Sequence, residues 1–513
     1  MNDIATPEAD ASPAVPTCAP GRSFEGIHKE RKKTSNRMLR RIARFRANGK
    51  EKSAEYLERC YERSQHAKTT ALIRANGDLP KAARLDLFRK SRAGIANPSS
   101  PDEEAKIERD RQYLLALADD PQMNLSLRCD EEVQILWKAK ASGKGYRNMH
   151  AFGLQKRARQ IIVCDILKPL AKAKADPRQF AIFGGGHQAA IAWAKELAPT
   201  MRWSAELDIK NSYPSFDLRP QEITGYQFAT IPLPQAIIDH VLMTEGDANL
   251  TTSIGSSYDN PYGNTPNPIK LLLEARRGLP QGSPGSSLVQ EMFVADLLRL
   301  VPDTETAKII NCADNFRVQA RTKEEVSALI KTLKEALAFL SAGQVSFSQK
   351  QEPRHVRYGM DFLGHRLKFS KGTFEVAPLE RSLDQFRKKA LELATRFDRH
   401  RSERTWRDLW RYVRSFRSAY PHWTKPDTLH GILWFMFASR FRFGAMTKPL
   451  ADLLTAPRGT PFTFPALPER PSEASSHFQR VRRRPGLKPG TGDIPRAMRS
   501  VRSSDIWRVR VVA

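Results

Sequence analysis

The chain has 513 residues, of which 40% are hydrophobic, enough to build several soluble domains around a sizeable core. Lys and Arg number 84 against 56 acidic residues, a formal net charge of +28, so we expect a polyanionic partner, with nucleic acid first. We find no signal peptide, no apolar run long enough to span a membrane and no C-x-x-C pair among the five cysteines. These features argue against a membrane protein, a zinc ribbon and a disulfide framework, and they predict a cytoplasmic location.

The N-terminal part of the chain divides into two segments by composition. Residues 1–21, rich in Ala, Pro, Ser and Asp, predict a disordered leader. Residues 22–129 predict a basic helical extension, because Met38, Ile42 and Phe45 recur at helical spacing among arginines. Such a charged surface is either a solvated helical face or an extension that binds RNA or another nucleic-acid strand.

Residues 130–200 alternate short strand-like runs with helices. Gln160 to Val163 has the β-branched composition of a strand, whereas His187 to Leu197 has helical spacing. Residues 201–373 contain several β-rich runs separated by helices. Together they predict a mixed α+β architecture.

The first candidate site lies near the start of the β-rich segment. Residues Ala205 to Ile209 predict a short apolar strand that carries Asp208 close to its end, before a turn. A carboxylate at a strand end projects from a rigid element, which suits a metal ligand. An Asp in this position is also a common turn former or helix cap.

The second candidate site is the loop from Arg276 to Ser287, with the sequence R-R-G-L-P-Q-G-S-P-G-S-S. Its glycines and prolines predict a loop whose backbone can approach a ligand closely. We expect Ser286 or Ser287 to cap the helix that follows.

The third candidate site is the segment from Ala307 to Ala320. Two apolar strand-like runs flank the triplet Ala313-Asp314-Asn315, which predicts a β-hairpin with Asp314 at its tip. An ordinary Asp-Asn turn is the alternative interpretation.

The C-terminal part is helical and then rich in Pro, Ser and Arg. Within residues 374–455, Leu409, Val413, Phe416 and Tyr420 repeat at helical spacing and are expected to face a core. On another face lie Arg407, Arg411 and Arg414, which could follow nucleic-acid phosphates or simply be solvated. Residues 456–513 predict a basic, flexible tail.

We call the Arg276–Ser287 segment the P-Q-G loop, after Pro280-Gln281-Gly282. A strand ending in Asp, then the P-Q-G loop, then an Ala-Asp hairpin is an order of motifs that resembles the palm of reverse transcriptases, and the resemblance covers roughly residues 130–445. The segments Gly343–Lys350 and Tyr358–His365 resemble the next two motifs of that family. The resemblance implies a right-hand polymerase with fingers (130–200), a ferredoxin-like palm (201–373) and a helical thumb (374–455). It implies an RNA-directed DNA polymerase that takes an RNA template and deoxynucleotides and makes a DNA product.

The resemblance also implies roles for single residues. Asp208 and Asp314 would bridge two Mg²⁺ ions, or Mn²⁺, with the backbone carbonyl of Ile209 completing one shell. Tyr213 would exclude a ribose 2′-hydroxyl and so select deoxynucleotides.

Further residues would contact the substrates. Gln281 and Gly282 would line the template and the incoming base, and Lys350 would act as an acid near the leaving pyrophosphate. Arg159 would contact the triphosphate from the fingers.

The sequence departs from the family at Asn315, where relatives usually carry a second acid, and it lacks the V-T-G triplet of retron enzymes. The stand-alone organisation resembles bacterial enzymes of antiphage defence and abortive infection, whose template can be a noncoding RNA. The alternatives are a domesticated group II intron enzyme, a catalytically silent RNA-binding protein on a polymerase scaffold, and an RNA-dependent RNA polymerase. The sequence indicates no oligomeric state.

Overall fold

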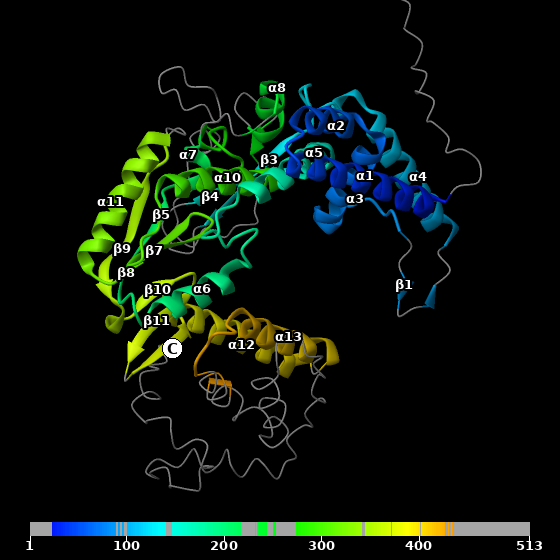
Figure 1. Ribbon diagram of the computed structural model, residues 1–513. Helices are drawn as coiled ribbons and strands as arrows, with labels where there is room; N and C mark the ends of the chain where they lie inside the picture. Colours follow the sequence, from blue (N-terminus) through cyan, green and yellow to red (C-terminus); the bar gives the residue numbers. More distant parts are fainter. Residues whose placement is uncertain are drawn as a thin grey trace, which may run out of the picture. The chain divides into compact units, whose positions relative to one another are not determined.

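The computed structural model describes residues 23–88, 91–92, 95–96, 100–139, 146–216, 231, 233–243, 250–252, 273–340, 344–370, 372–400, 402–425, 429 and 432–433. Within them the chain is an α+β protein of helices and small, mainly antiparallel sheets, as predicted (Figure 1). The predicted leader and the predicted tail from residue 456 lie outside the described residues.

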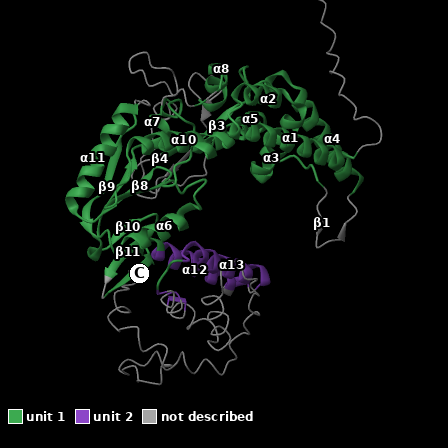
Figure 2. Cartoon of the chain, viewed as in Figure 1, with its two compact units in different colours: residues 1–382, 422–424 green, residues 383–421, 425–513 purple. Residues whose placement is uncertain are grey.

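The chain forms two compact units, coloured separately in Figure 2. The first runs to Ser382 and takes in His422–Thr424, and the second holds Leu383–Pro421 and the segment from Lys425 onward. Both acidic residues of the candidate site, Asp208 and Asp314, belong to the first unit. None of the helices in the described residues is long and apolar enough to cross a membrane.

Helices make up most of the N-terminal region. They are α1 (Phe24–Ala47), α2 (Glu51–Arg63), α3 (Gln65–Asp78) and α4 (Pro101–Asp119). Helix α1 begins where the Ser23 hydroxyl accepts the N–H of Gly26 at 3.2 Å. Helix α4 begins with a reciprocal capping box between Ser100 and Glu103. The starts of α1 and α4 therefore follow from local sequence signals.

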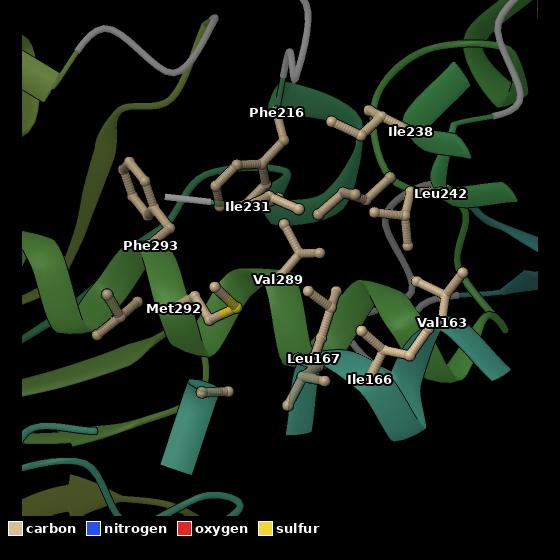
Figure 3. Packing of buried hydrophobic residues seen from close by; sticks show 14 of the residues in the cluster. Val163, Ile166, Leu167, Phe216, Ile231, Ile238, Leu242, Val289, Met292 and Phe293 are labelled. Carbon is tan, nitrogen blue, oxygen red and sulfur yellow. The ribbon is translucent and has the colours of Figure 1, made fainter. Parts of the chain in front are cut away.

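Helix α5 (Leu154–Lys174) corrects one expectation, because Gln160–Val163 is helical and not a strand. The buried side chains of α5 include Ala158, Ile162 and Ile166, which recur every four residues and form one apolar face. Helix α5 packs against α10 (Pro284–Leu300), and Leu167, Val289 and Met292 belong to the core that the two helices share (Figure 3). A short β-branched run fits a buried helix as well as a strand, so periodicity over the longer segment decides. The helix predicted from His187 to Leu197 is present as α6 (Gly186–Leu197).

A four-stranded antiparallel sheet carries the candidate site. Its strands are β5 (Trp203–Ile209), β7 (Ala307–Cys312), β8 (Asn315–Ala320) and β9 (Phe347–His355), in the order β7-β8-β5-β9. Helix α11 (Lys323–Leu340) packs on this sheet and on α10. The apolar sides of these elements belong to one core, and on the opposite face Ile310 and Cys312 of β7 pack in a second, smaller cluster.

Two smaller sheets flank this one in the chain. Strands β3 (Val133–Ala139) and β4 (Tyr146–Phe152) form a hairpin that β6 (Leu250–Thr252) joins in parallel. Strands β10 (Met360–Phe362), β11 (His365–Ser370) and β12 (Thr373–Pro378) form a meander. The turn between β10 and β11 has Leu363 and Gly364 at φ 47° and 80°, as a tight two-residue hairpin requires.

Short elements complete the first unit. They are β1 (Ser91–Arg92), β2 (Ile95–Ala96), α7 (Ser212–Ser215), α8 (Gln235–Ile237), a π-helical turn (Ile238–Leu242) and 3₁₀ turns at Lys81–Ala83, Pro121–Met123 and Val356–Tyr358.

The second unit is built on two amphipathic helices, α12 (Glu380–His400) and α13 (Glu403–Ala419). As predicted, Leu409 and Val413 are buried, and the ring of Phe416 packs against that of Phe386 in a tilted arrangement, with centroids 4.3 Å apart. Trp406 and Trp410 are buried as well, so large aromatic rings supply much of this small core.

Candidate active site

The pairing of β5 with β8 brings Asp208 and Asp314 together. Asp208 lies opposite Asn315 in the ladder, and the N–H of Ile209 donates to the carbonyl of Asp314 at 2.9 Å. Burial raises the pKa of Asp314, and the negative charge of Asp208 raises it further. Two acids separated by more than a hundred residues in the chain therefore share one polar site.

The hairpin that carries Asp314 is the predicted one, with Ala313 and Asp314 as its two turn residues. Ala313 has φ 57°, a left-handed conformation that costs a residue with a Cβ about 1–2 kcal/mol. The buried side chain of Asn311 donates to the carbonyls of Ala313 at 2.9 Å and Asn315 at 3.2 Å. These bonds hold the strained turn in place. Asn311 was not identified from the sequence, where it reads as one polar residue in an apolar strand.

Lys350 links the two acids through Asn315. Its ammonium lies 2.9 Å from Oδ2 of Asp208 and donates to Oδ1 of Asn315 at 2.7 Å. The amide of Asn315 in turn donates to Oδ1 of Asp314 at 2.8 Å. Asn315 thus accepts from the cation and donates to the acid, two roles that an ionised Asp could not combine.

A β-bulge gives Lys350 this position. Leu207 pairs with Gln349 and Glu206 pairs with Gln351, so Lys350 is an extra residue between two ladder partners. Bulges re-aim a side chain relative to the regular alternation of a strand. The sequence pointed to Lys350 only by resemblance, because a bulge leaves no clear periodic signal.

A third acid, Glu206, lies two residues before Asp208 and therefore on the same face of β5. Burial raises its pKa to about 6, while the charges of Lys350 and Arg317 oppose that shift. Arg317, its ladder partner on β8, is fully buried and stacks over the ring of Phe362 at 5.5 Å. The sequence did not single out Glu206 or Arg317, since each looks like an ordinary residue of an amphipathic strand.

The two carboxylates suit a hard cation that needs few ligands from the protein. Mg²⁺ is commonly held by one or two carboxylates, with water and substrate phosphates completing its shell. Asp208 and Asp314 supply two carboxylates, and within the described residues no group of three or more His, Cys, Asp or Glu side chains is arranged to hold a metal. The pair therefore fits Mg²⁺ or Mn²⁺ and does not fit a closed structural zinc site.

The P-Q-G loop packs directly against the turn that follows β5. Gly278 has φ 68°, and a Cβ there would come within 2.2 Å of the carbonyl oxygen of Tyr213. The N–H of Leu279 donates to that same carbonyl at 2.8 Å. Tyr213 is half-buried, and its pKa is raised by burial and then by the charges of Asp314 and Glu291. Tyr213 and the loop thus lie beside the acidic pair.

His150, on β4, holds the other end of this loop. Its backbone N–H donates to the carbonyl of Gln281 at 2.6 Å, and its Nε2 lies 2.9 Å from the carbonyl oxygen of Ala275. Gly282 has φ 116°, and a Cβ there would come within 2.5 Å of the carbonyl oxygen of His150. The loop is therefore clamped between β4 and the β5 turn. Sequence reasoning missed His150, because nothing local marks a partner that lies more than a hundred residues away.

The helix after the loop begins at Pro284 with Ser283 as its cap, not with Ser286 or Ser287 as expected. The hydroxyl of Ser286 instead donates to the carbonyl of Pro280 at 2.7 Å, and that of Ser287 to the carbonyl of Pro284 at 3.2 Å. Pro284 suits the first helical position, since its missing N–H would have no intrahelical partner there.

Arg159 does not reach the candidate site. Its side chain is 1% exposed and donates to the carbonyls of Gln122 at 2.7 Å and Leu125 at 3.1 Å, and to that of Leu127. These bonds fasten the segment before β3 onto α5, so the expected triphosphate contact is not supported. Arg147 on β4 is exposed, and its charge opposes the rise that burial causes in the pKa of Asp314.

A buried acid, Glu291 on α10, lies behind the hairpin. Burial raises its pKa to about 7, and its carboxylate accepts from the amide of Gln179 at 3.1 Å. Burial raises the pKa of the Cys312 thiol to about 12, and the negative charges of Glu291 and Asp314 add to this rise. Nothing in the sequence singles out Glu291, which lies within a long apolar helix.

The three predicted arginines of the second unit lie on α13. Arg407 and Arg411 are exposed and form ion pairs with Glu403 at 2.5 Å and Asp408 at 3.4 Å, while Arg414 is half-buried. Exposed ion pairs within a helix contribute little stability, so both guanidinium groups can exchange partners at low cost. Of the motif Gly343–Lys350, Gly343 lies outside the described residues.

No protein-family model matches this chain, and no curated protein matches it.

Proposed function

We propose that the chain is an RNA-directed DNA polymerase that uses two-metal phosphoryl transfer. The observation that carries the proposal is the β5–β8 pairing, which sets Asp208 beside Asp314. Phosphoryl transfer needs positioning and neutralisation of negative charge more than covalent help from the protein. Two acids on rigid strands, beside a flexible ammonium, meet that requirement.

Asp208, Asp314 and the carbonyl of Ile209 would hold the metal ions. When bound, Mg²⁺ or Mn²⁺ supplies positive charge at the attacking 3′-oxygen and at the leaving pyrophosphate. Lys350 keeps its ammonium at Asp208 until substrate phosphates attract it, and its Nζ can then donate a proton to the leaving group. Asn315 orients Asp314 by donating to one oxygen, which leaves the other oxygen for a cation.

Tyr213 and the P-Q-G loop would shape the nucleotide pocket. The half-buried ring of Tyr213 lies near Asp314, where it can exclude a 2′-hydroxyl and so favour deoxynucleotides. Gln281 and Gly282, clamped by His150, would line the template and the incoming base. A glycine at position 282 lets backbone approach a base pair without side-chain obstruction.

The architecture accommodates the parts of a right-hand polymerase. The β7-β8-β5-β9 sheet with α10 and α11 would serve as the palm, and β3, β4 and α5 as the fingers. Helices α12 and α13 would serve as the thumb, with Arg407, Arg411 and Arg414 contacting the phosphates of the product duplex.

A second candidate is a catalytically silent RNA-binding protein. It is favoured by Asn315, because reverse transcriptases usually carry a second acid at this position. It is also favoured by Lys350, whose ammonium pairs with Asp208. This candidate predicts that RNA binds but no nucleotide is incorporated.

Primer extension on an RNA template with deoxynucleotides and Mg²⁺ or Mn²⁺ separates these candidates. We expect extension by the wild type and only background extension by Asp208→Asn. Asp239→Asn is the matched control, because Asp239 is exposed, lies outside the candidate site and accepts a local hydrogen bond from Gln235 at 2.7 Å that an Asn oxygen can also accept. Equal extension by the wild type and Asp208→Asn would remove the polymerase proposal. Incorporation of ribonucleotides in the same reaction would instead indicate an RNA polymerase.

A further inference from the structure

Helix α1 carries a concentration of positive charge outside the candidate active site. It contains nine Lys and Arg residues within Phe24–Ala47. Two of these turn inward, because Arg31 donates to Thr69 and Arg46 pairs with Glu58 at 2.9 Å. The other seven are exposed: Lys29, Lys32, Lys33, Arg37, Arg40, Arg41 and Arg44.

Five of these cations form one narrow face. At the 3.6 residues per turn of an α-helix, the five span an arc of about 80° and a length of about 22 Å. We call this set the α1 basic face, and it consists of Lys29, Lys33, Arg37, Arg40 and Arg44. The buried residues Phe24, Ser35 and Ile42 lie on the opposite side of the helix, against the core.

The described part of the chain leaves the α1 basic face without a neutralising acid. Within the part of the chain that the structure describes, none of its five members forms an ion pair, and Arg44 only lies 6.0 Å from the ring of the adjacent Phe45. Like charges at spacings of three and four residues repel and destabilise a helix. The pattern therefore has a cost in the free protein that a bound polyanion would offset.

We propose that the α1 basic face binds the phosphate backbone of double-helical nucleic acid without regard to sequence. A straight helix with cations on one side suits a regular row of phosphates, which it can neutralise with release of counterions. The face contains no aromatic side chain among its five members, so it lacks the stacking surface on which single-stranded bases bind.

The same geometry disfavours an anionic membrane as the partner. An amphipathic helix binds a bilayer by inserting its apolar side. On α1 that side is occupied, because Phe24 and Ile42 are buried and Met38 and Leu39 pack against the same core. The binding site uses none of the residues assigned to catalysis, so the inference does not depend on the polymerase proposal.

Fluorescence anisotropy with a labelled RNA duplex, in EDTA and without nucleotides, tests the proposal on the full chain. The test variant is Arg37→Gln/Arg40→Gln/Arg44→Gln. The matched control is Lys323→Gln/Lys331→Gln/Lys334→Gln, which removes the same charge from exposed positions on α11. Circular dichroism establishes that both variants are folded.

We expect the α1 variant to bind the duplex roughly 10- to 100-fold more weakly at 0.15 M salt. Its slope of log affinity against log salt should fall by about 2–3, as for the loss of three phosphate contacts, while the α11 control stays close to the wild type. Equal losses in the two variants would show that net charge alone matters and would overturn the proposal. The proposal would also be overturned if the wild type bound single-stranded RNA through these residues as tightly as it binds duplex. Binding through these residues to phosphatidylserine vesicles, and not to duplex, would overturn it too.

Discussion

Replacing Asn315 with Asp changes both the charge and the hydrogen bonding of the acidic site. The amide now donates to Asp314 at 2.8 Å and accepts from Lys350 at 2.7 Å. An ionised Asp at position 315 would keep only the second bond and would repel Asp314. With Asp208, Asp314 and Lys350 the site carries one net negative charge, and Asn315→Asp would raise this to two.

The extra charge should tighten Mg²⁺ binding by a calculable amount. A unit charge about 5 Å from a divalent ion contributes about 1.7 kcal/mol at the permittivity of bulk water. Lys350 is substantially exposed and would pair with the new acid, which offsets part of this gain. We therefore expect about 1–1.7 kcal/mol, or roughly 5- to 20-fold tighter Mg²⁺ binding.

Isothermal titration with Mg²⁺ in the absence of nucleic acid measures this change directly, and a Mg²⁺ titration of primer extension provides a second readout. Asn48→Asp, at the exposed C-cap of α1, adds the same charge elsewhere and should leave both titrations unchanged. In EDTA, Asn315→Asp should melt at a lower temperature than the wild type, because Asp314 loses a donor and gains a repulsive neighbour. Unchanged or weaker Mg²⁺ binding by Asn315→Asp would refute the reasoning.

Two further predictions concern the surroundings of the acids. Burial raises the pKa of Glu291 from 4.5 to about 7, so the folded state holds a proton that the unfolded state releases, and stability should fall as pH rises between these values. In urea denaturation, the free energy of unfolding of Glu291→Gln should lack this fall with pH. It should exceed that of the wild type by up to about 3 kcal/mol at pH 8 and match it at pH 4. Parallel plots of unfolding free energy against pH for the two proteins would contradict this. Gly278→Ala should destabilise the protein by about 1–3 kcal/mol and abolish primer extension, because its Cβ would meet the Tyr213 carbonyl oxygen at 2.2 Å. Gly372 has a similar φ of 77° but open space around it, so Gly372→Ala should lose only the stability that backbone strain costs. Equal losses of stability in the two variants would show that the contact of residue 278 with the Tyr213 carbonyl does not matter.

Local sequence patterns were enough to predict the single elements of the site. The strand that carries Asp208, the hairpin with Asp314 in its turn and the helix at Gly186–Leu197 follow from periodicity and turn composition over a few residues. Such patterns depend on which side chains can be buried next to one another along the chain, and they need no knowledge of distant segments.

Which of these elements meet became known from the folded structure alone. The β5–β8 register, the bulge that aims Lys350 and the clamp of His150 on the loop at Gln281 all join segments that are far apart in sequence. It also turned Arg159 inward, because three backbone carbonyls before β3 required a buried donor. Long-range pairing depends on how the whole core excludes water and satisfies its polar groups, and no local window of the sequence contains that information.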